Sequence, residues 1–205
     1  KFKIESLHGS AVTSNKNTII FSGLAGVGKS LITLYLTLEK KFKLISDNYL
    51  LYDVKNIYAL PEWIRLLEDS GSIFPNIKNY LDRKKFKRND KNFYKLSENL
   101  ILNKSKPKFL IFTELSNSNK LIKINHNNSV NRILISKNHV REFPEQNFVG
   151  LLDLLLETKN FNFENENVTL KKFIKKNQTY IFYINKKISM SENVKFLIKK
   201  LKIKE

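Results

Sequence analysis

The sequence predicts an α/β fold in which helices pack on a mixed β-sheet. The first observation is a glycine-rich segment at residues 23–30, which stands between a β-branched apolar run at 18–22 and a run with helical spacing at 31–40. The second is that later short apolar runs are denser than a simple alternation of strands and helices would give, which favours a mixed sheet. The third is that 205 residues with 41% hydrophobic content suffice for the core of a single domain, residues 1–205.

Short apolar runs between turn residues predict the strands. They lie at residues 2–7, 11–13, 18–22, 42–46, 49–54, 57–60, 93–96, 108–115, 121–124 and 179–184. His8 and Gly9 predict a turn between the first two strands, and the run at 121–124 is the expected hairpin partner of the run at 108–115. The predicted sheet therefore combines hairpins with the strand that leads into the glycine-rich segment.

Apolar residues at helical spacing predict the helices. They lie at residues 31–40, 61–69, 129–135, 147–158, 168–176 and 191–201. The last helix is expected to be capped by Ser191, with Glu192 in its first turn. The segment 75–91 is polar and basic, and we expect it to be mobile.

The glycine-rich segment matches a pattern that binds phosphate, G-x-x-x-x-G-K-[ST]. Its residues are Gly23, Leu24, Ala25, Gly26, Val27, Gly28, Lys29 and Ser30. In this pattern successive backbone N–H groups surround phosphate oxygens, the Lys neutralises the β and γ phosphates, and the hydroxyl reaches Mg²⁺. The following helix directs its positive end at the anion. A strand, a glycine loop and a helix follow in the required order, so we predict a nucleotide-phosphate loop here.

Asp47 is the candidate for the remaining chemistry. Phosphoryl transfer requires Mg²⁺ ligands and a group that orients or deprotonates the acceptor hydroxyl. Asp47 ends the strand predicted at 42–46, at the sheet edge where ligands of α/β proteins bind, so it is a candidate general base or metal ligand. The alternative is an ordinary turn former or helix cap. His8, taken alone, is an ordinary turn residue.

Composition narrows the class of protein. The formal net charge is +18, with the clearest basic cluster at residues 83–88, but Lys and Asn are frequent throughout the chain. We therefore do not expect a nucleic-acid partner and interpret the cluster as a solvated helix end or a mobile loop. The absence of Cys excludes disulfides, thiolate zinc sites and a Cys nucleophile. No apolar run approaches the roughly 20 residues of a membrane span, and no signal peptide precedes Lys1, so we expect a cytoplasmic protein. Since the first residue is not Met, an upstream domain is allowed for.

Residues 7–48 resemble the catalytic domain of the HPr kinase/phosphorylase family. The resemblance rests on His8-Gly9-Ser10-Ala11-Val12, on the phosphate loop at 23–30, and on Leu44-Ile45-Ser46-Asp47-Asn48, in that order and at suitable spacing. It implies a mixed-sheet P-loop kinase domain of the HPr kinase / PEP carboxykinase-like type. It also implies ATP-dependent transfer of phosphate to a serine hydroxyl.

The resemblance assigns roles to individual residues. Lys29 and Ser30 match the phosphate and Mg²⁺ residues, Asp47 the base and a metal ligand, and His8 the histidine near the phosphates. The chain departs from the family where Asn48 replaces a second Asp and where the Glu-x-Arg-Gly-x-Gly signature is missing. Candidates to stand in for the missing acid are Glu62, Glu68 and Asp69, with ordinary charges on a helix surface as the favoured alternative. Candidates for a second cation are Lys91, Lys95, Arg83 and, most favoured, Arg65.

The first hypothesis from the sequence is a kinase that uses ATP and Mg²⁺ and acts on a protein serine or a small-molecule hydroxyl. The second, suggested by Asn48, is a nucleotide-binding or sensing module without catalysis. The third is a basic, nucleic-acid-associated P-loop NTPase. The sequence leaves open the identity of the acceptor and whether the protein forms a homo-oligomer.

Overall fold

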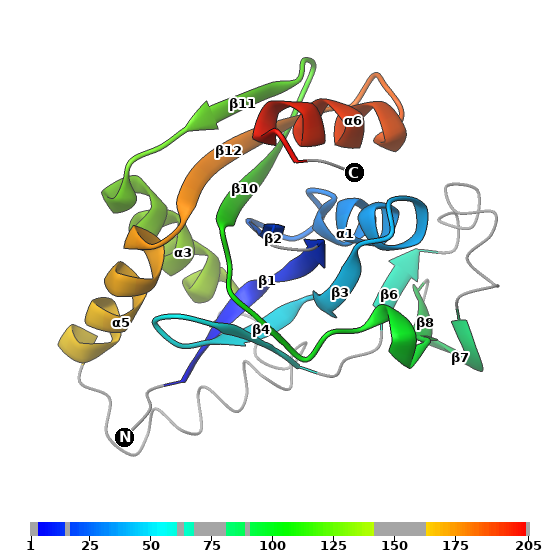
Figure 1. The fold of residues 1–205 in the computed structure, drawn as a ribbon, viewed down its shortest axis with the longest axis horizontal. Helices are drawn as coiled ribbons and strands as arrows, with labels where there is room; N and C mark the ends of the chain where they lie inside the picture. Colours follow the sequence, from blue (N-terminus) through cyan, green and yellow to red (C-terminus); the bar gives the residue numbers. More distant parts are fainter. Residues whose placement is uncertain are drawn as a thin grey trace.

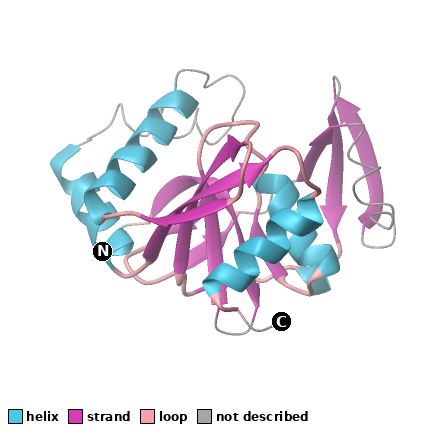
Figure 2. Cartoon of the chain, turned by 90° about the horizontal axis from the view of Figure 1, so that it is seen from above, coloured by secondary structure: helices cyan, strands magenta, loops and turns pink. Residues whose placement is uncertain are grey.

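The computed structural model describes residues 4–14, 17–60, 64–67, 81–88, 91–141 and 163–203. They form a mixed nine-stranded sheet with helices on both faces and a separate three-stranded sheet at one side (Figures 1 and 2). The large sheet consists of β1 (Glu5–Ser14), β2 (Asn17–Ser22), β3 (Lys43–Ser46), β4 (Tyr49–Tyr52), β5 (Ile57–Ala59), β9 (Lys104–Ser105), β10 (Phe109–Ser116), β11 (Lys120–Lys123) and β12 (Gln178–Asn185). The helices are α1 (Lys29–Glu39), α3 (His126–Arg141), α5 (Phe163–Lys175) and α6 (Met190–Leu201), with a short 3₁₀ turn, η2 (Glu98–Leu100).

The predicted α/β fold with a mixed sheet is confirmed. The strand order is β11-β12-β10-β2-β1-β4-β5-β9, and β3 also pairs with β1. β10 is parallel to both β2 and β12, whereas the other pairs of this sheet are antiparallel. In the parallel register Phe112 faces Ser22, so the residues that follow each of them lie side by side.

Strand alternation divides the core between the two faces of the sheet. Ile19 and Phe21 of β2 pack with α1 and α6, whereas Ile20 packs with α3 and α5 on the other face. The neighbouring strand β10 repeats the division, with Ile111 on the first face and Phe112 on the second. The sheet is therefore the middle of three layers, with a buried hydrophobic cluster on each of its faces (Figure 2).

The small sheet corrects two predictions. Its strands are β6 (Ile64–Leu67), β7 (Leu81–Arg88) and β8 (Lys91–Leu96), in the order β6-β8-β7. The helix predicted at 61–69 is wrong over Ile64–Leu67, and the segment expected to be mobile forms strand β7 over Leu81–Arg88, including the basic cluster. The physical reason is pairing with β8, since the antiparallel ladder supplies backbone hydrogen bonds that the local pattern does not reveal.

Gly9 lies inside a strand and not in a turn. The two predicted strands at 2–7 and 11–13 are one strand, β1, and Gly9 pairs with Ser22 of β2. A Cβ on Gly9 would lie 2.5 Å from the carbonyl oxygen of Phe21, closer than a real Cβ approaches. Position 9 therefore requires glycine because β2 approaches it closely. A glycine in the sequence can mark either a turn or such a close contact within a strand, and the local pattern does not distinguish the two.

Two details of the C-terminal half also differ from the predictions. β11 pairs with β12 and not with β10, because β12 inserts between them as a parallel neighbour of β10. Helix α6 begins at Met190 and is capped by Ser189, whose hydroxyl accepts from the Glu192 N–H in a capping box, so Ser191 is not the cap. The other predicted elements are present within a few residues, except that the helix at 147–158 lies outside the described residues. None of the described helices is long and apolar enough to traverse a lipid bilayer.

Candidate active site at the glycine-rich loop

The glycine-rich loop connects β2 to α1 at the carboxyl end of β2. Gly23, Gly26 and Gly28 have φ angles of 136°, 78° and 89°, which L side chains rarely adopt. A Cβ on Gly23 would also lie 3.0 Å from the carbonyl oxygen of Thr113 on β10. Gly28 precedes α1 and provides no side-chain cap, so the N–H groups of the first helical turn are open to an anion.

Lys29 directs its side chain back into this loop. Its Nζ donates hydrogen bonds to the carbonyl oxygens of Gly23, at 2.9 Å, and Leu24, at 2.7 Å. The residue is 7% exposed. Burial lowers the pKa of the Lys29 ammonium to about 8, and the negative charge of Asp47 opposes this shift. A desolvated cation inside the loop is an arrangement that favours the binding of an anion there.

Asp47 reaches the same edge through β3. This strand is antiparallel to β1, which is itself antiparallel to β2, so β3 and β2 end at the same edge. Asp47 is 6% exposed and lies close enough to Lys29 to affect its pKa. Asn48, in the position of the second Asp expected from the family, has a φ of 77° and accepts a hydrogen bond from the N–H of Gly9 at 2.9 Å. Asn tolerates this left-handed conformation better than most residues, so Asn48 is explained as a turn residue.

His8 lies in the middle of β1 and is tied to the loop through its backbone. Its carbonyl oxygen accepts a hydrogen bond from Ser22 Oγ at 3.1 Å. The imidazole is 5.5 Å from the Tyr49 ring, centroid to centroid, and its Nδ1 lies 3.3 Å from Ser136 Oγ on α3. The structure thus brings the loop, Lys29, Asp47 and His8 to one edge of the sheet.

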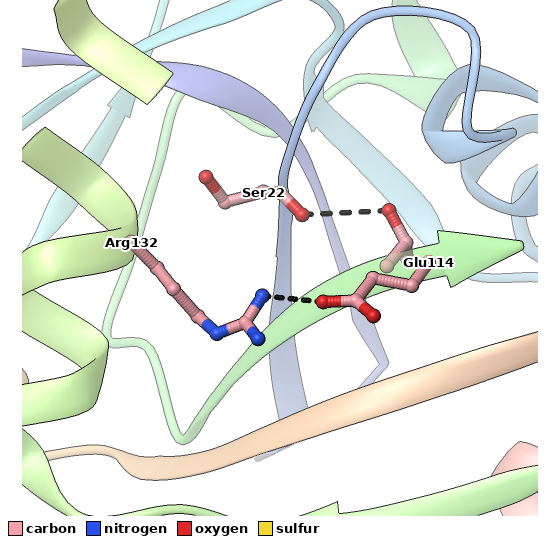
Figure 3. A network of polar contacts seen from close by, with 4 residues as sticks. Ser22, Glu114 and Arg132 are labelled. Carbon is pink, nitrogen blue, oxygen red and sulfur yellow. Dashed lines mark hydrogen bonds and ion pairs between the residues drawn. The ribbon is translucent and has the colours of Figure 1, made fainter. Parts of the chain in front are cut away.

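Two residues at this edge were missed by the sequence analysis. Glu114 follows Thr113 on β10, beside the start of the loop, and its carboxylate forms an ion pair with Arg132 of α3 at 2.5 Å (Figure 3). The sequence did contain an indication for Glu114, because an acidic residue follows the apolar run of the clearest strand in the second half of the chain. Arg132 had no such signal, because only the packing of α3 brings it near the loop.

The residues proposed to replace the family's missing charges lie either outside the described residues or on the strands of the small sheet. Glu62, Glu68 and Asp69 lie outside the described residues. The candidates for the second cation are on the small sheet: Arg65 on β6, Arg83 on β7, and Lys91 and Lys95 on β8. Arg132 is a cation that the described structure places beside the loop, in its ion pair with Glu114.

A cavity of about 450 Å³ opens beside the loop, between β10 and α3. We call it the β10–α3 cavity. Its wall includes Gly23 and Leu24 at the loop end and the Glu114–Arg132 pair. Ser136, the hydrogen-bond partner of His8, also lines it. The cavity therefore extends from the start of the loop to the ion pair and to Ser136.

No family model matches this chain. No curated protein matches it either. Among solved structures, the fold is similar to the Hpr(Ser) kinase/phosphatase from Coxiella burnetii, with a TM-score of 0.35 and 12% sequence identity. That similarity covers 58% of this chain and 72% of the other.

The oxygen groups at this edge have the chemistry that Mg²⁺ prefers. Ser30 lies in the first turn of α1, Asp47 directly follows β3, and Glu114 lies near the carboxyl end of β10. Among the described residues there is no group of three or more His, Cys, Asp or Glu arranged to hold a metal. Mg²⁺ usually takes one or two carboxylates and completes its shell with substrate phosphates and water, so this small donor set fits a metal that arrives with a nucleotide.

Proposed function

We propose that this protein is an ATP-dependent phosphotransferase that moves the γ-phosphate to the hydroxyl of a serine-type or small-molecule acceptor. The observation that carries the proposal is the Lys29 ammonium held inside the glycine-rich loop, with the buried carboxylate of Asp47 close by. A cation and an acid at this position are what transfer of a phosphoryl group requires. The match of residues 7–48 to the HPr kinase pattern supports the same assignment, with a P-loop kinase domain of the HPr kinase / PEP carboxykinase-like type.

Nucleotide binding follows from the loop. The N–H groups of residues 23–30 would surround the β-phosphate, and the open first turn of α1 would direct its positive end at it. Lys29 would exchange the carbonyls of Gly23 and Leu24 for oxygens of the β and γ phosphates. Ser30, Asp47 and Glu114 would hold Mg²⁺, which neutralises charge on the phosphates when it is bound.

The transfer itself needs few protein groups. The acceptor oxygen forms a bond to the γ phosphorus while the bond from that phosphorus to the β–γ bridging oxygen breaks, and ADP leaves. The proton of the acceptor hydroxyl passes to Asp47. Lys29 stabilises the charge that develops on the bridging oxygen. His8, held by Ser136 and Tyr49, would orient the acceptor or a γ-phosphate oxygen.

The test follows label from γ-labelled ATP and Mg²⁺ into free amino acids, hydroxylated metabolites, peptides and a cell extract. We expect one class of acceptor to gain label with the native protein. Lys29→Met should abolish the transfer together with nucleotide binding. Asp47→Asn should keep nucleotide binding and lower the rate by about 10²–10⁴-fold, the usual contribution of a general base.

Controls for both variants are available on exposed positions. Lys43→Met, at the exposed start of β3, and Glu39→Gln, at the exposed end of α1, make the same changes away from the loop. Both should behave as the native protein does. Normal turnover by Asp47→Asn would remove Asp47 from the role of base.

The same experiment decides the second candidate, a nucleotide-binding module without catalysis. Asn48 favours it, because the turn holds an amide where the family pattern has a carboxylate. Such a module would bind ATP through Lys29 and label no acceptor. Introducing Asn48→Asp would then be expected to change metal dependence without creating turnover.

A further inference from the structure

The β10–α3 cavity lies on the side of the loop where the terminal phosphate is expected. Lys29 reaches the β and γ phosphates in loops of this pattern. Its ammonium is at the carbonyls of Gly23 and Leu24, and these two residues form the loop end of the cavity wall. A molecule in the cavity would therefore lie beside the end of the loop at which Lys29 is expected to hold the terminal phosphate.

The cavity has one cationic group among the described residues that line it, the guanidinium of Arg132. This group already binds a carboxylate, that of Glu114, at 2.5 Å (Figure 3). It also lies 5.8 Å from the centre of the Phe112 ring. The two side chains are 35% and 37% exposed. Because ion pairs at such exposure are weak, another carboxylate can take the place of Glu114 at little cost.

Glu114 has an alternative partner when nucleotide is bound. It stands beside the start of the loop, at the edge where the metal that accompanies the phosphates is proposed to bind. A carboxylate that turns to this metal releases Arg132. Planar guanidinium groups bind carboxylates with two parallel hydrogen bonds, so the released Arg132 selects a ligand of that shape.

The rest of the wall is largely apolar. Phe112 and Ile181 form buried parts of it, and Ile135 of α3 is 61% exposed at the same cavity. An exposed large apolar side chain on a cavity wall favours a ligand with a short hydrocarbon part. The polar remainder comes from Asn128, Asn131 and Ser136. A volume of about 450 Å³ is in the range of sites for small molecules.

We propose that the β10–α3 cavity binds the phosphate acceptor, and that this acceptor is a small molecule with both a hydroxyl and a carboxylate group. Arg132 holds the carboxylate, Phe112 and Ile135 contact the carbon chain, and the hydroxyl faces the loop. The orientation of the acceptor rests on the proposed function, whereas binding of a carboxylate at Arg132 does not. Since Glu114 must first release Arg132, the acceptor binds more tightly after Mg²⁺ and nucleotide.

The test measures binding of a panel of hydroxy acids by calorimetry or ligand-observed NMR. The panel is L-serine, L-threonine, L-homoserine, glycerate and 2-hydroxyisovalerate, each compared with its amide, with and without ADP and Mg²⁺. We expect at least one acid to bind, its amide to bind at least tenfold more weakly, and the affinity to rise several-fold with ADP and Mg²⁺. The comparison with amides uses only the native protein, so it holds even if variants fold poorly.

The matched variants are Arg132→Gln and Lys195→Gln. The first removes the cavity's cation, and the second removes an exposed cation from α6 on the opposite face. Arg132→Gln should lower affinity for the acid at least tenfold without weakening the binding of nucleotide and Mg²⁺, since it only frees Glu114 for the metal. Lys195→Gln should alter neither affinity. Equal binding of acid and amide, or full affinity in Arg132→Gln, overturns the proposal.

The outcomes separate this proposal from the proposed function. Arg132-dependent binding of an acid without transfer of label would support the cavity assignment and contradict the kinase. Transfer of label to a protein serine with no binding by any member of the panel would support the kinase and overturn the cavity assignment. Transfer to the bound acid, lost in Arg132→Gln through a higher KM, supports both.

Discussion

Lys29 is a cation that the fold removes from water before any ligand arrives. Lowering its pKa from 10.5 to about 8 by burial, against the opposing charge of Asp47, corresponds to about 3 kcal/mol. Each of the two hydrogen bonds from Lys29 to the Gly23 and Leu24 carbonyls offsets about 1 kcal/mol of this cost. Because Lys29→Met also removes the positive charge near the buried Asp47 carboxylate, it should change the free energy of unfolding at pH 7 by no more than about 1 kcal/mol. A loss of more than about 1 kcal/mol would mean that the ammonium contributes to the fold and not only to binding.

Gly23 and Gly26 provide a matched pair of substitutions in the loop. Both have positive φ, but a Cβ on Gly23 meets the Thr113 carbonyl at 3.0 Å, and a Cβ on Gly26 meets nothing within 4 Å. Gly26→Ala should cost about 1 kcal/mol of backbone strain, and Gly23→Ala about 2–3 kcal/mol, because it also displaces β10. The free energies of unfolding of the two variants check this order. Equal losses of unfolding free energy in the two variants would show that the loop accommodates the new Cβ without displacing β10.

At the scale of elements, the turn between β4 and β5 depends on one carboxylate. Partial burial opposes ionisation of Asp53, but hydrogen bonds from the Tyr58 hydroxyl and from the N–H groups of Lys55 and Asn56 outweigh it and lower its pKa to about 2. Because the folded pKa lies below the ordinary value of 3.8, the carboxylate stabilises the fold above about pH 4 and loses this effect as the pH falls toward 2.

Asp53→Asn should therefore cost about 1 kcal/mol at pH 7, after allowance for solvent screening. The difference in unfolding free energy between native and variant protein should narrow as the pH is lowered from about 5 to about 2.5. Glu39→Gln, which removes a negative charge at the exposed end of α1, is the control variant. A difference that stays constant with pH would show that the side chain acts by shape and not by charge.

The sequence predicted correctly those elements whose apolar pattern is visible within their own residues. β2, α1, β10 and β12 each present an apolar run or stripe between clear turn residues, and each was predicted within a few residues. The elements that failed depend on distant partners. Ile64–Leu67 is a strand because β8 pairs with it across the chain, and Gly9 is extended because Phe21 approaches it. β12, far along the sequence, takes the place beside β10 that β11 was expected to occupy.

The candidate site divides in the same way. The loop and Asp47 carry their chemistry in adjacent residues, so the pattern alone located them. Glu114 and Arg132 reach the loop through the parallel pairing of β10 with β2 and the packing of α3 on the sheet. Those contacts join residues about ninety positions apart, with Phe112 facing Ser22, and no local spacing encodes them.

At the scale of the whole molecule, the net charge of +18 is the dominant electrostatic feature. Repulsion among surface cations opposes the compact state and is screened over about 10 Å at 0.1 M salt. Raising NaCl from about 20 to about 200 mM should therefore raise the melting temperature by several degrees. Lys29→Met should show the same rise, which separates general screening from binding of chloride in the loop. A melting temperature that does not change with salt would show that the charges are already neutralised by one another.

The position of β11 at the margin of the nine-stranded sheet has a consequence for solubility. This strand is only four residues long, and exposed lysines, Lys120 and Lys123, stand at its two ends. A strand of another molecule that paired with β11 would lie close to both lysines and would gain few backbone hydrogen bonds from so short a strand. The short length and the two lysines of β11 therefore disfavour edge-to-edge aggregation, although Ile122 is exposed on this edge strand of the described sheet.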